Sequence, residues 1–300
     1  MIPRNCPICD GKAGDQYFPY ATRFDDTVFR YFRCTDCGSV FVNPIPSKET
    51  FSRMYAKKVY HDDHYAEHLC KEEWDGQNYA ESARLLRIYL PAGTIVLDYG
   101  CGLGGFLLAL RKQGFFPFGV ELDEAAAQAA ANRASCEVHS LDGFGRLVSV
   151  PQFDAIHLGD VLEHLPFPAD TLRGLLATLK PNGILFVEGP LENNASLVYI
   201  SAKAFGAVKR RLKPNYIGLA PPTHLFRVNS QVQKMLFSRI DERMELISWS
   251  VYETGWPYTS GSILKRAIAA LARMLGGRRL LGLTFGNRFR GIFRLKATAP

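Results

Sequence analysis

Between residues 79 and 188, hydrophobic positions alternate between two patterns, short continuous apolar runs and longer segments with helical spacing. The apolar runs, which are typical of buried strands, occupy residues 94–98, 116–122, 136–141, 153–159 and 183–188. The helical segments occupy residues 79–90, 106–113, 123–133 and 170–179. Strands that alternate with helices predict a parallel sheet whose crossover helices cover both faces.

Two more strand-like segments and one more helix follow toward the C-terminus. Residues 244–252 and 291–297 have strand composition, and Ser230 is expected to cap a helix over 231–240. With these strands added, the prediction is an α/β fold with a Rossmann-like, doubly wound sheet of seven strands. The segment from Gly189 to Tyr216 is expected to be irregular and basic.

Four of the seven cysteines form two closely spaced pairs. Two residues separate Cys6 from Cys9 and Cys34 from Cys37, and 24 residues lie between the pairs. Two such turns supply the four thiolates that structural zinc prefers, and four cysteine ligands leave no open position for chemistry. The spacing therefore predicts a structural zinc ribbon. Disulfides and unligated thiols are the alternatives, and disulfides are disfavoured without a secretion signal.

A glycine-rich loop follows the strand predicted at 94–98. Gly100, Gly102 and Gly104 directly precede a helix, and such a loop lets the backbone approach a ligand closely. Glu121 ends the next strand, 21 residues after Gly100, where a carboxylate can accept both hydroxyls of a ribose. A nucleoside-containing cofactor is therefore expected. The pattern alone does not separate NAD from S-adenosylmethionine.

The motifs along the sheet resemble those of the class I S-adenosylmethionine-dependent methyltransferases. Residues 96–104, Val-Leu-Asp-Tyr-Gly-Cys-Gly-Leu-Gly, resemble their first motif, and residues 119–121, Gly-Val-Glu, resemble their second. Residues 153–165 resemble their fourth strand with its loop, and residues 179–188 resemble the turn and strand that come next. The four matches lie in the order that the family has.

The resemblance implies cofactor contacts at the carboxyl ends of four strands. In chain order they are Asp98 near the methionine amino group, Gly100, Gly102 and Gly104 along the methionine portion, Glu121 with Leu122 at the ribose, Asp142 and Gly143 with Phe144 at the adenine, and Asp160 near the methyl group. Asp142 before a glycine is also the composition of a simple turn.

The whole chain also resembles a group of bacterial methyltransferases with an N-terminal zinc ribbon. As in that group, the second cysteine pair leads into residues 40–46, and a Pro-Pro-x-His-Leu segment lies at 221–225. The expected domains are a zinc ribbon at 1–46, a helical linker and lid region at 47–90, and a class I methyltransferase domain at 91–300 with insertions at about 191–228 and 254–290.

Many members of that group act on sugars or on precursors of polysaccharides and natural products. The resemblance therefore implies a small-molecule or lipid-linked acceptor, most simply a hydroxyl of a sugar, nucleotide-sugar or lipid-linked glycan. Because a hydroxyl nucleophile needs a base nearby, His164 after the fourth strand and His224 in a proline-braced loop are the candidates. Glu163 and Tyr216 are weaker candidates.

The composition is that of a globular protein, with 47% hydrophobic and 22% charged residues. No apolar run reaches the roughly 18 residues that cross a bilayer, and the N-terminus lacks the apolar stretch of a signal peptide, so a cytoplasmic location is expected. The net charge of +7 is divided unevenly. Residues 200–300 hold 18 Lys/Arg and 4 Asp/Glu, a net +14, whereas residues 1–199 hold 18 and 25, a net −7.

An RNA methyltransferase that binds nucleic acid through the zinc ribbon and this basic C-terminal third is therefore the alternative function. Against it, the fourth strand ends Gly-Asp-Val-Leu at 159–162, not in the Asn/Asp-Pro-Pro-Tyr loop that serves exocyclic amino groups. The cysteine turns also carry few basic residues. Nucleic acid is therefore the less favoured partner.

The insertion at 254–290 contains an amphipathic helix over 262–275. One side carries Leu264, Ile268, Leu271 and Leu275, and the other carries Lys265, Arg266 and Arg273. Two interpretations stay open: packing on its own domain or on a dimer partner, and peripheral contact of residues 262–279 with an anionic membrane at its inner face.

Overall fold

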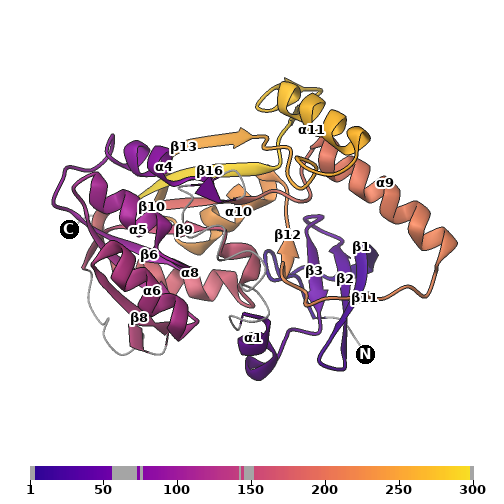
Figure 1. Cartoon of the computed structure of the whole chain (residues 1–300), viewed down its shortest axis with the longest axis horizontal. Coiled ribbons are helices and arrows are strands. Elements are labelled where there is room, and N and C mark those ends of the chain that lie inside the picture. The colour runs from indigo at the N-terminus through magenta and orange to yellow at the C-terminus, as the bar shows by residue number, and fades with distance from the viewer. Residues whose placement is uncertain (1–3, 56–72, 75–76, 142, 145–151, 298–300) are drawn as a thin grey trace.

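The computed structural model describes residues 4–55, 73–74, 77–141, 143–144 and 152–297. Its central sheet has seven strands in the order β13-β16-β10-β9-β6-β7-β8 (Figure 1). Their bounds are Ile95–Tyr99 (β6), Phe116–Glu121 (β7), Glu137–Ser140 (β8), Phe153–Gly159 (β9), Leu179–Pro190 (β10), Met244–Tyr252 (β13) and Arg288–Leu295 (β16). The five adjacent strands β10, β9, β6, β7 and β8 are parallel to one another. Strand β16 is antiparallel to both of its neighbours, β10 and β13. The predicted seven-stranded α/β sheet is confirmed.

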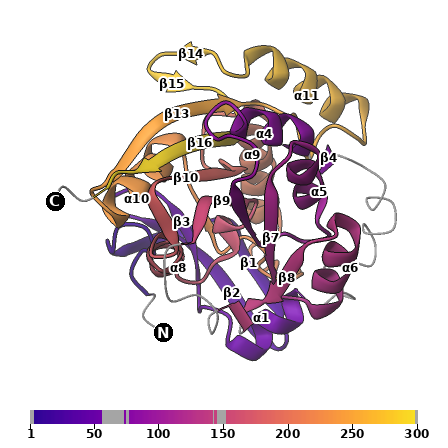
Figure 2. The same cartoon turned by 90° about the vertical axis from the view of Figure 1, so that its left-hand side faces the viewer.

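Helices cover both faces of this sheet (Figure 2). One face carries α4 (Tyr79–Leu86), α5 (Gly105–Lys112) and α6 (Glu124–Ala134), and the other carries α8 (Pro168–Leu176) and α10 (Ser230–Ile240). Because successive strand residues point to opposite faces, Val96 packs with α4 and α5, whereas Leu97 packs with the core beneath α8 and α10. The strands are continuous apolar runs because both of their faces are buried.

A second sheet has five strands in the order β11-β1-β2-β3-β12. It joins β1 (Ala13–Phe24), β2 (Thr27–Cys34) and β3 (Val40–Asn43) to β11 (Gly218–Leu219) and β12 (Phe226–Arg227). Strand β11 pairs in parallel with β1, and β12 pairs antiparallel with β3. Its core is shared with the large sheet, since Cys6, Cys34 and Phe41 belong to the same buried cluster as Leu158 and Leu185. The cysteine-containing N-terminus and the segment around residues 218–227 therefore form one structural unit.

The segment from Gly189 to Tyr216 was expected to be irregular. It contains instead the 16-residue helix α9 (Leu197–Leu212). Its N-terminal half packs Val198 against α11 (Ile263–Leu275), and Gly206 lies against the ring of Phe18 in β1. Only Val198 and Tyr199 of this helix are buried, whereas Phe205, Val208 and Leu212 are more than half exposed, and its last turn is basic. The helix therefore lacks the buried apolar side by which a core helix is usually predicted.

Two other details differ from the sequence prediction. The cap of α10 is Asn229, whose Oδ1 accepts from the N–H of Val232 at 2.9 Å, and Ser230 is the first helical residue. In α11, Ala269 and Ala272 are buried, whereas Leu264 and Leu271 are 61% and 55% exposed. The predicted apolar side of α11 is therefore only half covered by the protein.

Short elements complete the described part. They are α1 (Lys48–Met54), the pair β4 (Glu73–Trp74) and β5 (Gln77–Asn78), the 3-10 turn η1 (Leu162–His164), and the hairpin β14 (Arg279–Leu280) and β15 (Leu283–Thr284). Among the helices described, none has the length and apolar character needed to span a bilayer.

Candidate active site and cysteine cluster

The glycine-rich loop turns sharply between β6 and α5. Gly100, Gly102 and Gly104 have φ values of +78°, +52° and +76°, a region that favours glycine. A Cβ on Gly100 would lie 2.5 Å from Cγ2 of Val161, and a Cβ on Gly104 would lie 2.9 Å from Cα of Ala130. The loop therefore needs glycine to lie against the end of β9 and against α6.

Glu121 is held at the end of β7 beside this loop. Its carboxylate accepts hydrogen bonds from the N–H of Gly102 at 2.8 Å and from the N–H of Leu122 at 2.7 Å. Burial raises the pKa of Glu121, and these backbone donors oppose that rise. The structure thus brings the expected ribose ligand into direct contact with the expected methionine-binding loop.

Asp98 lies at the end of β6 in a buried row of charges that sequence reasoning missed. Its Oδ1 is 2.7 Å from Nδ1 of His157, whose Nε2 is 3.5 Å from Glu188, and Arg290 donates to Glu188 at 2.8 Å. Burial opposes the charge on His157, but Asp98 and Glu188 raise its pKa to about 9. The row crosses β6, β9, β10 and β16, and its one sequence signal is a histidine inside the apolar run 153–159.

Of the three residues expected at the adenine, the structure describes Gly143 and Phe144. The N–H of Gly143 donates to Ser140 Oγ at 3.2 Å, and Phe144 is buried against the rings of Phe118 and Phe153. Asp142 lies outside the described residues.

A cavity of about 60 Å³ lies at the carboxyl ends of β9 and β10. It is lined by Asp160, Glu163, His164, Pro190, Tyr199, His224, Thr254, Trp256, Asn287 and Arg288. Arg288 donates through Nη2 to both carboxylate oxygens of Asp160, at 2.6 and 2.7 Å. Val161 lies between the lining residues Asp160 and Glu163, and its side chain fills the space where a Cβ on Gly100 would stand, so the segment that lines this cavity adjoins the glycine loop.

His224 is oriented in this cavity by a carboxylate. Its Nδ1 lies 2.6 Å from Oε2 of Glu192, and Arg227 Nη1 lies 3.2 Å from the other oxygen of Glu192. A carboxylate can only accept, so Nδ1 carries the proton and Nε2 of the neutral ring is the basic atom. Burial opposes protonation of His224, but Glu192 and Glu163 raise the pKa of its ring above the ordinary value.

His164 lies beside His224, with ring centroids 4.8 Å apart. Its Nδ1 is 2.7 Å from the carbonyl oxygen of Thr223 and 2.7 Å from the hydroxyl of Tyr55. Burial and the neighbouring His224 lower the pKa of His164 to about 3, so this ring stays neutral. Burial and the charge of Asp160 raise the pKa of Glu163, which favours its protonated form in the same cavity.

Two groups of side chains could hold a metal ion within the described residues. The first consists of Glu163, His164 and His224, whose ligand atoms lie within 4.8 Å of one another. The second consists of the four cysteines of the predicted zinc ribbon, Cys6, Cys9, Cys34 and Cys37.

The geometry of the cysteine cluster fits zinc. Sγ of Cys6 lies 3.8 Å from that of Cys37, and Sγ of Cys9 lies 3.5 Å from that of Cys34. A tetrahedron with Zn–S bonds of about 2.3 Å has S···S edges of about 3.8 Å. The N–H of Ile8 also points at Cys6 Sγ, at 3.4 Å, and such donors stabilise thiolates.

The structure separates the remaining sequence candidates. His164, His224, Glu163 and Asp160 meet in one cavity, whereas Tyr216 lines a different one. Glu192 and Arg288, which orient His224 and Asp160, were missed by sequence reasoning. Neither lies in a recognisable motif, and their roles depend on contacts between distant segments.

Comparison with known proteins agrees with this geometry. A family model described as a methyltransferase domain matches residues 62–269, more than half of the chain. The chain therefore belongs to this methyltransferase family. The sequence-based assignment to the S-adenosylmethionine-dependent methyltransferases is confirmed at the level of family and fold.

Similar curated proteins include the ubiquinone biosynthesis O-methyltransferase of Coxiella burnetii, which is 30% identical over 112 residues. That match covers 36% of this chain and 48% of the relative. The corresponding enzyme of Pseudomonas fluorescens is 31% identical over 101 residues, covering 32% and 44%. The chain thus spans about half the length of the curated relatives it matches.

Two solved structures show the same fold. A SAM-dependent methyltransferase of Methanosarcina mazei superposes with a TM-score of 0.50 at 14% identity, covering 71% of this chain and 98% of that chain. A chain from the complex between the Haloferax volcanii Trm112 methyltransferase activator and a methyltransferase has a TM-score of 0.50 at 16% identity, covering 79% and 98%.

Proposed function

We propose that this methyltransferase transfers a methyl group from S-adenosylmethionine to a hydroxyl of a small-molecule acceptor. The acceptor class is a sugar, a nucleotide-sugar or a lipid-linked glycan, and His224 is the base. The observation that carries this proposal is the pair of His224 and Glu192 in a cavity that adjoins the glycine loop. The names of the Coxiella and Pseudomonas relatives, which are O-methyltransferases, support oxygen as the acceptor atom.

The cofactor supplies an electrophilic methyl group on its sulfonium sulfur, so the chain must align the acceptor and exclude water. Gly100, Gly102, Gly104 and Glu121 form the cofactor surface. As the O–CH₃ bond forms and the C–S bond breaks, Nε2 of His224 takes the hydroxyl proton. The carboxylate of Glu192, 2.6 Å from Nδ1, then stabilises the imidazolium. The neutral ring of His164 and the protonated carboxyl group of Glu163 are further polar groups that would line the acceptor site.

The test is a pH–rate profile of the wild type and of His224→Gln, measured as release of S-adenosylhomocysteine. The acceptor panel contains UDP-glucose, a polyprenyl-diphosphate-linked sugar and tRNA, since RNA is the alternative acceptor. Loss of a general base lowers turnover by about 10²- to 10⁴-fold. Because the base must be unprotonated, wild-type kcat/KM should fall as the pH drops through the raised pKa of His224, above 6.5. The variant should lack this acid limb and keep its affinity for S-adenosylhomocysteine.

His139→Gln is the matched control, because His139 lies on β8 outside the cavity lining. It should retain both the rate and the acid limb. A His224→Gln enzyme that keeps the wild-type rate and pH profile would exclude His224 as the base. Methyl transfer to tRNA alone would overturn the small-molecule acceptor.

We further propose that Cys6, Cys9, Cys34 and Cys37 hold one structural zinc ion. The S···S distances of 3.5 and 3.8 Å support this site. With four thiolate ligands the ion has no open position, so its contribution is to fix the turns that begin β1 and end β2.

A peripheral membrane contact through residues 262–279 is part of the same proposal. Ile263 and Met274 of α11 are 86% and 68% exposed, and Leu281 at the tip of the β14–β15 hairpin is fully exposed. Arg266 and Arg273 of the same helix and Arg278 and Arg279 after it are exposed as well. Apolar and cationic groups on one short helix are typical of an interfacial helix on anionic lipid. Co-sedimentation with anionic but not with neutral vesicles would test this contact.

A further inference from the structure

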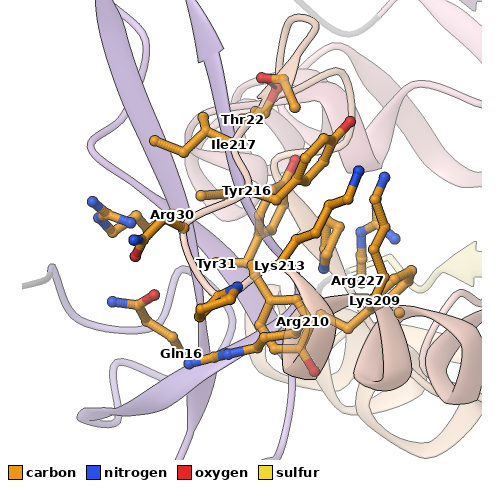
Figure 3. Close-up of a pocket in the computed structure, with 18 of the residues that line it drawn as sticks. Gln16, Thr22, Arg30, Tyr31, Lys209, Arg210, Lys213, Tyr216, Ile217 and Arg227 are labelled. Atoms are coloured by element: carbon orange, nitrogen blue, oxygen red, sulfur yellow. Dashed lines mark hydrogen bonds between the residues drawn. The ribbon is translucent and has the colours of Figure 1, made fainter.

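A second cavity, of about 470 Å³, lies between the five-stranded sheet and the C-terminal half of α9. Its walls are β1, β2, the last turns of α9 and residues 213–221 (Figure 3). This volume is within the roughly 300–1,000 Å³ of small-molecule sites. We refer to it as the basic cavity.

The walls of the basic cavity are fixed by backbone contacts. Strand β11 pairs with β1 through Thr22 and Gly218, which holds residues 213–221 at the edge of the sheet. Helix α9 approaches β1 at Gly206, where a Cβ would lie 2.4 Å from the ring of Phe18. The cavity is therefore part of the fold and is not a gap between loosely joined domains.

Its lining is strongly cationic. Five basic side chains line it, Arg30, Lys209, Arg210, Lys213 and Arg227, and none of the described lining residues is acidic. In Figure 3, Arg30 and Gln16 lie on one side of the cavity, and Lys209, Lys213 and Arg227 lie on the other. Like charges gathered in a concave site concentrate the positive potential and attract anions.

Aromatic rings hold two of these cations along the walls. Nζ of Lys209 lies 3.6 Å from the ring centroid of Tyr216, and the guanidinium of Arg210 lies 4.3 Å from that of Tyr20. Among the described residues, neither of these two cations is paired with a carboxylate. The rings also give the cavity apolar surface, which suits a ligand that carries both an anionic group and an organic portion.

The basic cavity and the candidate active site have no described lining residue in common, but two residues of the basic cavity contact side chains that orient or form the active site. Arg227 lines the basic cavity and contacts Glu192, which in turn orients His224. Thr223 also lines the basic cavity, and its carbonyl oxygen lies 2.7 Å from Nδ1 of His164. Nε of Arg227 is buried and has no hydrogen-bond partner in the described structure. A ligand anchored in the basic cavity therefore lies one layer of side chains away from both active-site histidines.

We infer that the basic cavity binds the diphosphate of the methyl acceptor, which links the methylated group to a nucleoside or to a lipid. Arg and Lys from opposite walls would neutralise the diphosphate through charge-assisted hydrogen bonds. The tyrosine rings would contact the organic portion. This inference rests on the proposed function, because it identifies the anchoring part of the acceptor for the same site.

The test is calorimetric titration of the full chain at fixed ionic strength with UDP, farnesyl diphosphate, uridine and a short single-stranded RNA. The variants are Arg30→Glu and Lys213→Glu, from opposite walls. The matched control is Arg211→Glu, since Arg211 is an exposed residue of the same helix end outside the cavity lining. S-Adenosylhomocysteine is titrated in parallel on every variant to report folding and the cofactor site.

A diphosphate should bind to the wild type and to Arg211→Glu, and each cavity variant should weaken it by about 10-fold or more, which corresponds to about 1.4 kcal/mol. Binding of UDP assigns a nucleotide-linked acceptor, and binding of farnesyl diphosphate assigns a lipid-linked one. Affinity for uridine equal to that for UDP would overturn the inference. So would equal losses in Arg211→Glu and the cavity variants, or preferential binding of RNA. If S-adenosylhomocysteine binds while no diphosphate does, this inference alone fails; if S-adenosylhomocysteine does not bind, the proposed function fails first.

Discussion

The cofactor half and the acceptor half of the candidate site are built in different ways. The cofactor half is contiguous: β6, the glycine loop, α5, β7 and α6 follow one another from Ile95 to Ala134. The acceptor half joins distant segments, since Arg288 reaches Asp160 across 128 residues and His224 reaches Glu192 across 32. Its walls also include the cysteine-containing sheet.

This difference explains what each half contributes. A strand, a tight loop and a helix can be specified by neighbouring residues, and the cofactor surface can therefore stay the same across many acceptors. An acceptor pocket that depends on pairings such as β12 with β3 changes whenever one of the distant segments changes. We therefore expect that a change in one half impairs the function of that half and leaves the function of the other half intact.

Removal of the proposed zinc ion should have the largest effect, and it should act on the acceptor half. Structural zinc contributes about 10–16 kcal/mol in zinc-finger peptides, so chelation should unfold the turns that carry Cys6 and Cys34. The backbone amides of β1, β2 and β12 should then lose their protection from hydrogen exchange, and those of β6 and β7 should keep it. Turnover should be lost while S-adenosylhomocysteine still binds.

Cys9→Ser should reproduce the effect of chelation, with Cys136→Ser as the control, because Cys136 lies before β8 outside the cluster. The zinc content is measured by atomic emission. Equal losses of cofactor affinity and turnover would contradict the separation of the two halves, and full protection of β1 and β2 without metal would contradict the structural zinc.

Replacement of Glu121 should have a smaller effect, confined to the cofactor half. A hydrogen bond to a charged group contributes about 1.5–3 kcal/mol, so Glu121→Ala should weaken S-adenosylhomocysteine by about 10- to 100-fold. Diphosphate binding in the basic cavity should not change. Titration calorimetry measures both, and Glu124→Ala, an exposed residue of the first turn of α6, is the control. If Glu121→Ala binds S-adenosylhomocysteine with the wild-type affinity, Glu121 does not bind the ribose.

The same division separates what the sequence predicted from what it did not. The bounds of β9 and β13, the cap at Asp123 and the turn at Gly100 depend on local composition and were predicted correctly. Helix α9 was missed because its segment is basic and its apolar residues Phe205, Val208 and Leu212 stay exposed, so they do not mark a buried helix. His224 was a candidate because prolines precede it, but its partner Glu192 has no local signature. Such contacts exist only after the distant segments have packed together.

The smallest expected effects come from two helix caps, that of α6 in the cofactor half and that of α10, which follows the segment carrying His224. Asp123 accepts from the N–H of Ala126 at 2.8 Å, and Asn229 accepts from the N–H of Val232 at 2.9 Å. Replacing either cap with alanine should lower the free energy of unfolding by about 1 kcal/mol, measured by urea denaturation. The functional effects should differ, because the Asp123 side chain fixes the turn whose backbone N–H donates to Glu121 at 3.2 Å. In Asp123→Ala this N–H remains but is no longer held in place by the cap. Asp123→Ala should therefore weaken S-adenosylhomocysteine measurably, whereas Asn229→Ala should leave its affinity unchanged. If both caps change cofactor affinity alike, α6 and α10 are coupled through the shared core, and the two halves are not independent.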